Sequence, residues 1–174
     1  SDVCSSDLEQ SLAYFPDQRQ WLLGTMLAYE PDSWHLSMNY LRIGAKGRLL
    51  FPREWGREQF FVTLPRGRLE GTGNTDMLVA KARKRWSERL YAEIALAKSW
   101  LPAPEEYRRN KYGAVSYWGW VADLQYIPAR PVLEGLSVRL LYVGRMSPGK
   151  DIPLREMYYN TNFHHLNLVT QLTF

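Results

Sequence analysis

The sequence of 174 residues lacks several features that define common classes of protein. Its only cysteine is Cys4, which excludes a disulfide framework and a thiolate metal site. No run approaches about 18 uncharged apolar residues, so a transmembrane helix is excluded. The net charge is only +4, too small an excess to indicate nucleic acid by itself. Membrane-spanning β-strands are not excluded, because each needs only about 9–11 residues with every second one apolar.

The sequence also shows no arrangement that predicts catalysis or a cofactor. No Ser-His-Asp, Cys-His or paired-carboxylate set can be identified from spacing. His164 and His165 are neighbours, so on a strand they point to opposite faces and cannot share a metal ion. The basic run from Lys81 to Arg85 alternates like a strand and has no interleaved aromatic residues to stack on bases. We therefore expect no enzyme activity, no cofactor, no metal and no nucleic-acid partner.

The first eight residues, SDVCSSDL, differ from the rest of the chain. They have no charged n-region, no apolar h-region and no small-residue cleavage site, so they are not a signal peptide. They resemble the translated read-through of a sequencing adapter, and the alternative is a disordered tail. In either case we exclude residues 1–8 and treat residues 9–174 as the folded part, which we expect to be the C-terminal portion of a longer protein.

Aromatic residues and alternation are abundant. Fourteen per cent of the residues are aromatic, including seven Trp and eleven Tyr. Apolar and polar residues alternate with a period of two, which is typical of strands with two different faces. The clearest segment is the last, in which Leu166, Leu168, Leu172 and Phe174 share a face. Six more segments of roughly ten residues alternate in the same way, at about 21–29, 34–40, 75–86, 90–99, 117–126 and 136–145.

The connections between these segments alternate in length. Short ones lie at about 31–33, 87–89 and 128–135, and long ones at about 44–74, 101–116 and 146–158. This parity is typical of bacterial outer-membrane barrels, and Trp and Tyr near the segment ends fit their aromatic girdles. The pattern therefore predicts an all-β fold: the C-terminal part of a transmembrane β-barrel, with about seven antiparallel strands, long extracellular loops and short periplasmic turns.

Residues 77–101 also fit a helix. They are rich in Ala, Lys, Arg and Glu, and Trp86, Leu90 and Ile94 follow helical spacing. The corner at 87–89 has no Gly, Pro or Asn, the residues most common in tight turns. Only the place of this stretch in the alternating connection lengths favours two strands.

One part of the sequence resembles a motif of a known family. It reads LFPREWGREQFF over residues 50–61, then LPRGR over 64–68 and EG over 70–71. Together with a final strand that ends in Phe174, this motif resembles that of the OprD-type substrate-specific porins of Gram-negative outer membranes. It departs from the family pattern at Gln59 and Gly67. The resemblance covers essentially the whole folded part and implies the last strands of a larger barrel.

The resemblance implies a channel in the bacterial outer membrane for passive, substrate-selective diffusion of small carboxylate-bearing or amino-acid-like nutrients. The loop at 44–74 would fold inward and form part of the pore constriction, with Arg53, Glu54, Arg57, Arg66 and Arg68. A row of basic side chains on the lumen wall, a basic ladder, would guide the solute through the pore. Its members would be the basic residues that the alternation places on the inward side, namely Lys81, Arg83, Arg85 and Arg139. Arginine suits this task because it stays charged and offers a planar fork to a carboxylate.

The same resemblance implies three kinds of partner. Outer-membrane lipid would contact the apolar faces of the strands, and small anionic or zwitterionic solutes would pass through the lumen. The barrel assembly machinery would recognise Phe174 as part of an assembly signal, since outer-membrane barrels characteristically end on an aromatic residue.

Two other classes of protein fit parts of the pattern. A soluble all-β ligand-binding protein of lipocalin type also has alternating strands, but it would bury its apolar face and expose polar residues. A secreted α+β enzyme would use residues 77–101 as a helix. A requirement for detergent and a nearly pure β circular dichroism spectrum would favour the barrel over both.

Overall fold

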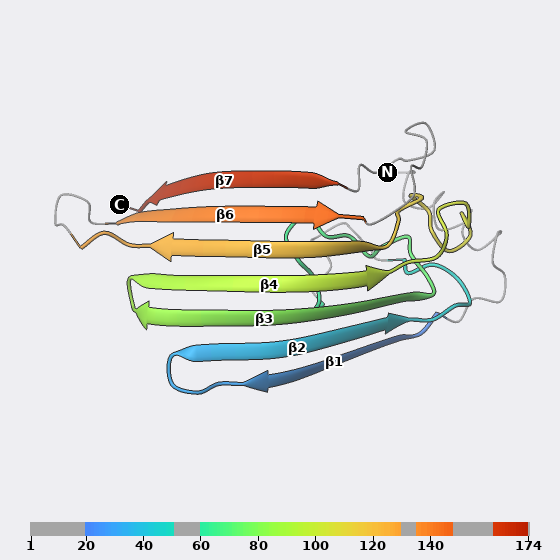
Figure 1. Cartoon of the computed structure of the whole chain (residues 1–174), viewed down its shortest axis with the longest axis horizontal. Coiled ribbons are helices and arrows are strands. Elements are labelled where there is room, and N and C mark those ends of the chain that lie inside the picture. Colours follow the sequence, from blue (N-terminus) through green and yellow to red (C-terminus); the bar gives the residue numbers. More distant parts are fainter. Residues whose placement is uncertain (1–19, 51–59, 130–134, 148–161, 174) are drawn as a thin grey trace.

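The computed structural model describes residues 20–50, 60–129, 135–147 and 162–173. Together they form one sheet in which each strand pairs antiparallel with the next along the chain (Figure 1). Its seven strands are β1 (Leu22–Tyr29), β2 (Trp34–Ile43), β3 (Thr75–Ser87), β4 (Leu90–Trp100), β5 (Tyr117–Tyr126), β6 (Leu136–Met146) and β7 (Phe163–Leu172). The prediction of an all-β fold with seven antiparallel strands is confirmed. Within the described ranges, no helix is long and apolar enough to span a membrane.

The stretch that also fitted a helix forms β3 and β4. These strands pair from Asp76 opposite Trp100 to Ser87 opposite Leu90, and a turn at 88–89 joins them. β2 and β5 flank the hairpin on its two sides, so its backbone groups are bonded in both directions. This pairing outweighs the helical spacing of a few apolar residues, because intrinsic propensity is weak against tertiary context.

The register places alternate residues of every strand, most of them apolar, on one side of the sheet, which we call the outer face. One row across it consists of Leu36, Ala82, Ile94, Ala122, Tyr142 and Leu166. Large side chains on this face are exposed: Ile94 retains 62% and Leu166 retains 68% of its accessible surface. Among the described residues, no second layer covers the outer face.

The turns and the long loops lie at opposite ends of the sheet (Figure 1). The turn end carries the short segments 30–33 and 88–89, and the loop end carries the long segments 44–74 and 101–116. Asp32 adopts a φ of 44° in the first turn, a left-handed conformation that Asp tolerates better than most residues. The alternation in length read from the sequence thus separates the two ends of the sheet.

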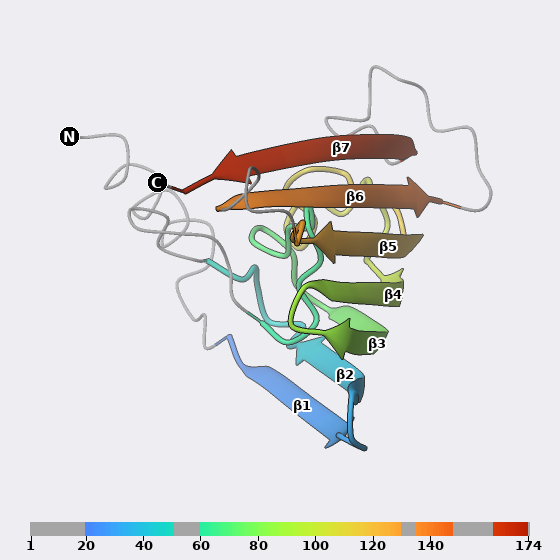
Figure 2. The ribbon, with the colours of Figure 1, turned by 90° about the vertical axis from the view of Figure 1, so that its left-hand side faces the viewer.

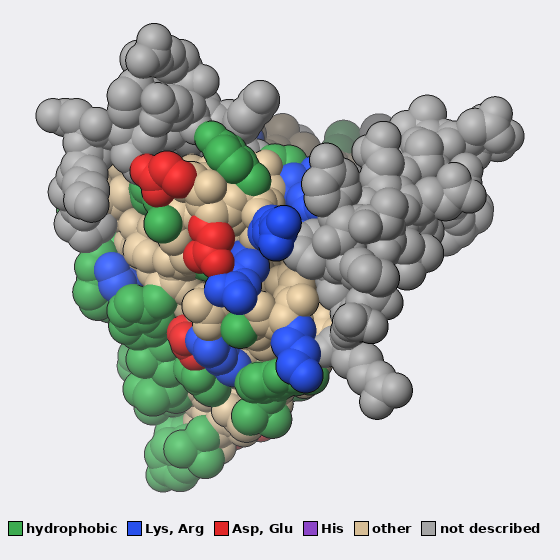
Figure 3. All heavy atoms as spheres, turned by 90° about the vertical axis from the view of Figure 1, so that its right-hand side faces the viewer, with side chains coloured by type: hydrophobic (Ala, Val, Ile, Leu, Met, Phe, Trp, Pro, Cys, Tyr) green, Lys and Arg blue, Asp and Glu red, His purple; other side chains and the backbone are tan. Residues whose placement is uncertain are grey.

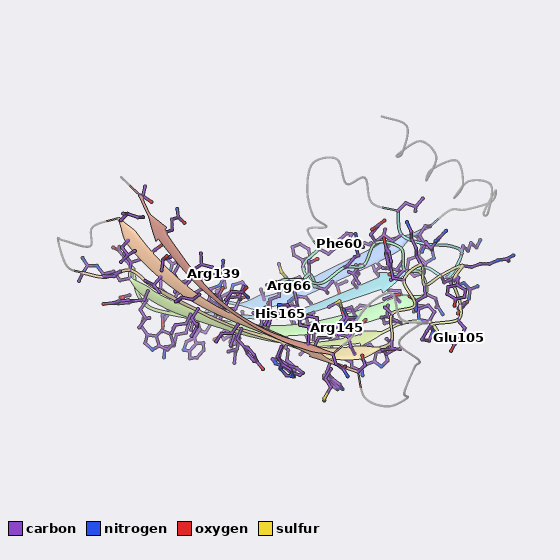
Figure 4. The ribbon with its side chains drawn as sticks, turned by 90° about the horizontal axis from the view of Figure 1, so that it is seen from above. Phe60, Arg66, Glu105, Arg139, Arg145 and His165 are labelled. Atoms are coloured by element: carbon purple, nitrogen blue, oxygen red, sulfur yellow. The ribbon has the colours of Figure 1, made fainter. Side chains whose placement is uncertain are left out.

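The buried core lies on the opposite side of the sheet, which we call the inner face. Residues 60–74 of the long β2–β3 connection fold over the loop end of this face (Figure 2). Their side chains Val62, Leu64 and Leu69 are buried against strand residues Leu41, Ile43, Met77, Val79, Ala95, Ala97, Val121 and Val143. Viewed edge-on, the sheet is curved and the loop lies on its concave side (Figure 4).

Candidate functional site

The inner face has an apolar half at the loop end and a charged half at the turn end. The apolar half is the core described above. Two neighbouring rows form the charged half: one holds His35, Arg83, Glu93 and Asp123, and the other holds Arg85, Tyr91, Gln125 and Arg139. In the first row Arg83 faces Glu93, and Glu93 in turn lies opposite Asp123, a like charge whose partner is Arg139 in the second row.

Arg83 of β3 is paired with Glu93, which lies directly opposite on β4. Its Nε and Nη2 atoms donate to Oε2 of Glu93 at 2.9 and 2.7 Å. The Arg83 guanidinium also lies 5.9 Å from the centre of the Tyr91 ring. The carboxylate of Glu93 therefore balances the charge of Arg83 locally.

Asp123 of β5 forms a second pair with Arg139 of β6. Nε of Arg139 donates to Oδ1 at 2.9 Å and Nη2 donates to Oδ2 at 2.6 Å, which is a two-pronged contact. The Tyr91 hydroxyl donates to Oδ2 of the same carboxylate at 3.3 Å. Asp123 is only 6% exposed, whereas 44% of the Arg139 side chain is exposed, so the arginine forms the open side of this pair.

Lys81 connects strand β3 to the long loop between β2 and β3. Its Nζ donates to the backbone carbonyl of Phe61 at 2.8 Å. Phe60, next to Phe61, is partly buried against the core cluster and lies on the concave side of the sheet (Figure 4). The bond therefore lies at the border between the apolar and charged halves, where the loop begins to cover the inner face.

The four predicted ladder residues all lie on the inner face, but they do not form one row. Lys81, Arg83 and Arg85 follow each other along β3, and Arg139 lies on β6, three strands away. Lys81 binds the loop, and Arg83 and Arg139 are each paired with a carboxylate. Of the four, Arg85 is the one for which the described part of the chain provides no side-chain hydrogen bond or ion pair.

The structure describes two of the five predicted constriction residues. The Arg68 guanidinium lies 4.7 Å from the centre of the Tyr112 ring, and its Nε lies 3.6 Å from Oε2 of Glu70. Arg66 is exposed, with a φ of 62°, and lies on the concave side of the sheet (Figure 4). The remaining predicted residues, and the proposed assembly signal, lie outside the described residues: Arg53, Glu54, Arg57 and Phe174.

The sequence reasoning missed the contribution of the second long loop, residues 101–116. Asn110 in this loop is fully buried. Its side chain donates to the carbonyls of Pro102 and Ala114 at 3.1 and 2.7 Å, and its Oδ1 accepts from the Ala114 amide at 2.9 Å. Asn110 also forms a β-bridge with Thr72 of the first loop. The two loops are therefore docked on each other, and no local pattern around this asparagine predicts that contact.

The loop end shows how the charges are distributed. Lys and Arg side chains gather there beside Asp and Glu, and hydrophobic side chains run along one edge, where the outer face begins (Figure 3). Half-exposed arginines next to carboxylates can exchange one carboxylate partner for another, because the two-pronged contact fits any carboxylate.

In comparisons with known proteins, no family model, no curated protein and no solved structure matches the chain.

Proposed function

We propose that the chain forms part of the wall of an outer-membrane channel that passes small carboxylate-bearing or amino-acid-like solutes by passive diffusion. One observation carries this proposal: the exposed outer face is mostly apolar across all seven strands, whereas the inner face holds the pairs Arg83–Glu93 and Asp123–Arg139 and the loops. A soluble sheet has the opposite polarity, with its apolar side buried and its polar side in water. A barrel strand in lipid has an apolar side outward and a polar side toward the lumen.

The spacing of tryptophans on the outer face supports this placement. Trp86 lies near the turn end of β3. Trp100 of β4 lies opposite Asp76, which is at the loop end of β3. Ten residues separate positions 76 and 86, which is about 33 Å along a strand at roughly 3.3 Å per residue. With a strand tilt of about 40°, this length spans about 25 Å across a bilayer, the height of the apolar band of outer-membrane barrels.

Closure of the barrel is part of the proposal. Among the described residues, β1 and β7 each pair on one side only. An unpaired strand edge is not stable in the hydrocarbon region, because its backbone groups would have no hydrogen-bond partners. We therefore propose that further strands, in line with the expected C-terminal position of this chain in a longer protein, pair with both edges.

In this proposal the inner face is the lumen wall. The loop at 60–74, held by the bond between Lys81 and Phe61, narrows the lumen from the concave side. The charged half would form the path along which a carboxylate moves between guanidinium groups. Arg53 and Arg57, which lie outside the described residues, would add positive charge at the constriction.

Planar-bilayer recordings of the complete barrel test this function. We expect a steady conductance with anion preference, and uptake of small carboxylates into proteoliposomes. Replacing Arg53 and Arg57 together by Gln should shift the selectivity toward cations. A protein that is extracted into buffer without detergent and gives no conductance would instead support the lipocalin-like alternative.

A further inference from the structure

The outer face of the described strands carries four charged side chains. Arg42 and Asp76 form an ion pair with each other at the loop end. Lys84 on β3 and Lys98 on β4 are the other two, and the described residues provide neither with a carboxylate partner. An ammonium group on an otherwise apolar surface is costly unless an anion accompanies it. A negatively charged group from outside the described residues would therefore stabilise both lysines.

Each of these lysines lies between two tryptophan rings. Nζ of Lys84 is 4.6 Å from the ring centre of Trp34 and 5.4 Å from that of Trp86. Nζ of Lys98 is 4.8 Å from the ring centre of Trp118 and 5.9 Å from that of Trp100. Cation–π contacts of this kind orient each ammonium group without neutralising it.

Each ammonium group is nearest the tryptophan directly opposite it in the register, and its second tryptophan lies closer to one end of the sheet. Trp86 is two residues nearer the turn end than Lys84, and Trp100 is two residues nearer the loop end than Lys98. The second ring of Lys84 therefore lies on the turn-end side of this lysine, and that of Lys98 on its loop-end side. Lysines near the borders of a membrane lie with the stem on apolar surface and the charge at the headgroups.

The two lysines lie at different depths of the proposed bilayer, Lys84 nearer the turn end and Lys98 nearer the loop end. Lys98 lies opposite Leu78, which is six residues from Lys84 along β3. This separation is about 20 Å along the strand, and about 15 Å across the bilayer at a tilt of about 40°. Lysine side chains are long enough for the ammonium groups to reach the edges of an apolar band about 25 Å high from these positions.

We propose that Lys84 with Trp34 and Trp86, and Lys98 with Trp100 and Trp118, are two binding sites for the phosphate of an anionic lipid headgroup, one in each leaflet. This inference rests on the proposed placement of the outer face in a bilayer. The ammonium group offers a charge-assisted hydrogen bond to the phosphate. The indole rings fill the headgroup region beside it, and their N–H groups are further donors.

Quenching of tryptophan fluorescence by brominated lipids tests the proposal. The complete barrel is reconstituted in phosphatidylcholine vesicles that contain brominated phosphatidylglycerol or, separately, brominated phosphatidylcholine. We expect stronger quenching by the anionic lipid, with each site preferring it about fivefold over phosphatidylcholine. In the double variant Lys84→Met, Lys98→Met, the ratio of quenching by the two lipids should fall to near one. Lys84→Arg with Lys98→Arg should restore the preference, because it keeps both charges.

The matched control is Lys111→Met, which removes the same charge from an exposed position in the second loop, away from the outer face. It should leave the preference unchanged. If the double variant does not insert, the single variants are compared instead, and each should lose the preference of one site.

Two outcomes separate this inference from the proposed function. Equal quenching by both lipids in the wild-type protein, or an equal loss of preference in the Lys111 control, would overturn the two lipid sites but leave the membrane placement intact. Absence of quenching by either lipid would overturn the membrane placement itself.

Discussion

Trp120 of β5 lies across Gly144 of β6, so closely that a Cβ atom at position 144 would come within 2.1 Å of the indole Nε1. The two residues are direct neighbours in the register and lie on the outer face. The Trp120 ring also lies 5.8 Å from the ring centre of His164 on β7. Glycine at position 144 is therefore what allows the tryptophan to reach across a whole strand.

Replacing Gly144 by Ala should lower the free energy of unfolding by about 1–3 kcal/mol, because the added methyl group displaces the Trp120 ring. Gly119→Ala is the matched control, since Gly119 lies on the same strand as Trp120 and faces inward. There, a Cβ would meet its nearest atom, Cδ1 of Leu64, at 3.5 Å, an ordinary contact. Denaturant unfolding of the folded barrel in lipid measures both variants, and equal losses would contradict the explanation.

The two faces of the sheet could be predicted from the sequence because alternation is a local property. In a strand, residues two apart lie on the same side, so Leu166 and Leu168 share a face whatever their neighbours are. The same period predicted that Lys81, Arg83 and Arg85 lie together on the opposite face of β3, and the register shows them there. The strands and their order followed from this pattern and from the alternating connection lengths.

The partners of the charged residues could not be predicted in the same way. The pairing of Arg83 with Glu93 depends on the register between β3 and β4, which includes an irregularity between Arg85 and Ser87. The bond between Lys81 and the Phe61 carbonyl depends on how a long loop folds back over the sheet. These are long-range contacts, and no local period encodes them.

The orientation of the two faces is tested by two neighbouring positions on β5. Leu124 lies on the outer face opposite Leu140 of β6, and Gln125 lies on the inner face opposite Arg139. Leu124→Arg should reduce barrel stability by about 2–4 kcal/mol, the penalty for arginine near the middle of the lipid face. Gln125→Arg should be tolerated. Unfolding measurements in lipid vesicles that give equal losses at both positions would contradict the orientation.

The attachment of the loop is tested at Lys81. Lys81→Met removes the hydrogen bond to the Phe61 carbonyl, and a bond of about 1 kcal/mol corresponds to roughly fivefold more frequent opening of the loop. Trypsin cleavage after the exposed Arg66 measures this opening, and its rate should rise by about that factor. Lys84→Met, on the outer face of the same strand, should leave the rate unchanged. Similar rates in wild type and Lys81→Met would show that this bond does not hold the loop.

The paired and unpaired arginines of the charged half should contribute differently to ion selectivity. Arg83 and Glu93 form a locally neutral pair, whereas the described residues leave the Arg85 side chain without a carboxylate partner. An ion in the lumen therefore experiences the charge of Arg85 more strongly than that of the pair, because opposite charges in contact largely cancel at a distance.

Arg85→Gln should accordingly shift the anion-to-cation permeability ratio toward cations by about two- to fivefold, which corresponds to on the order of 0.5–1 kcal/mol for one partly screened charge. Replacing Arg83 and Glu93 together by Gln removes both members of the pair, so the net charge of the lumen stays the same and the ratio should hardly change. Reversal potentials in a salt gradient measure all three proteins. A large shift in the double variant with none in Arg85→Gln would mean that the paired residues, and not Arg85, set the selectivity of the charged half.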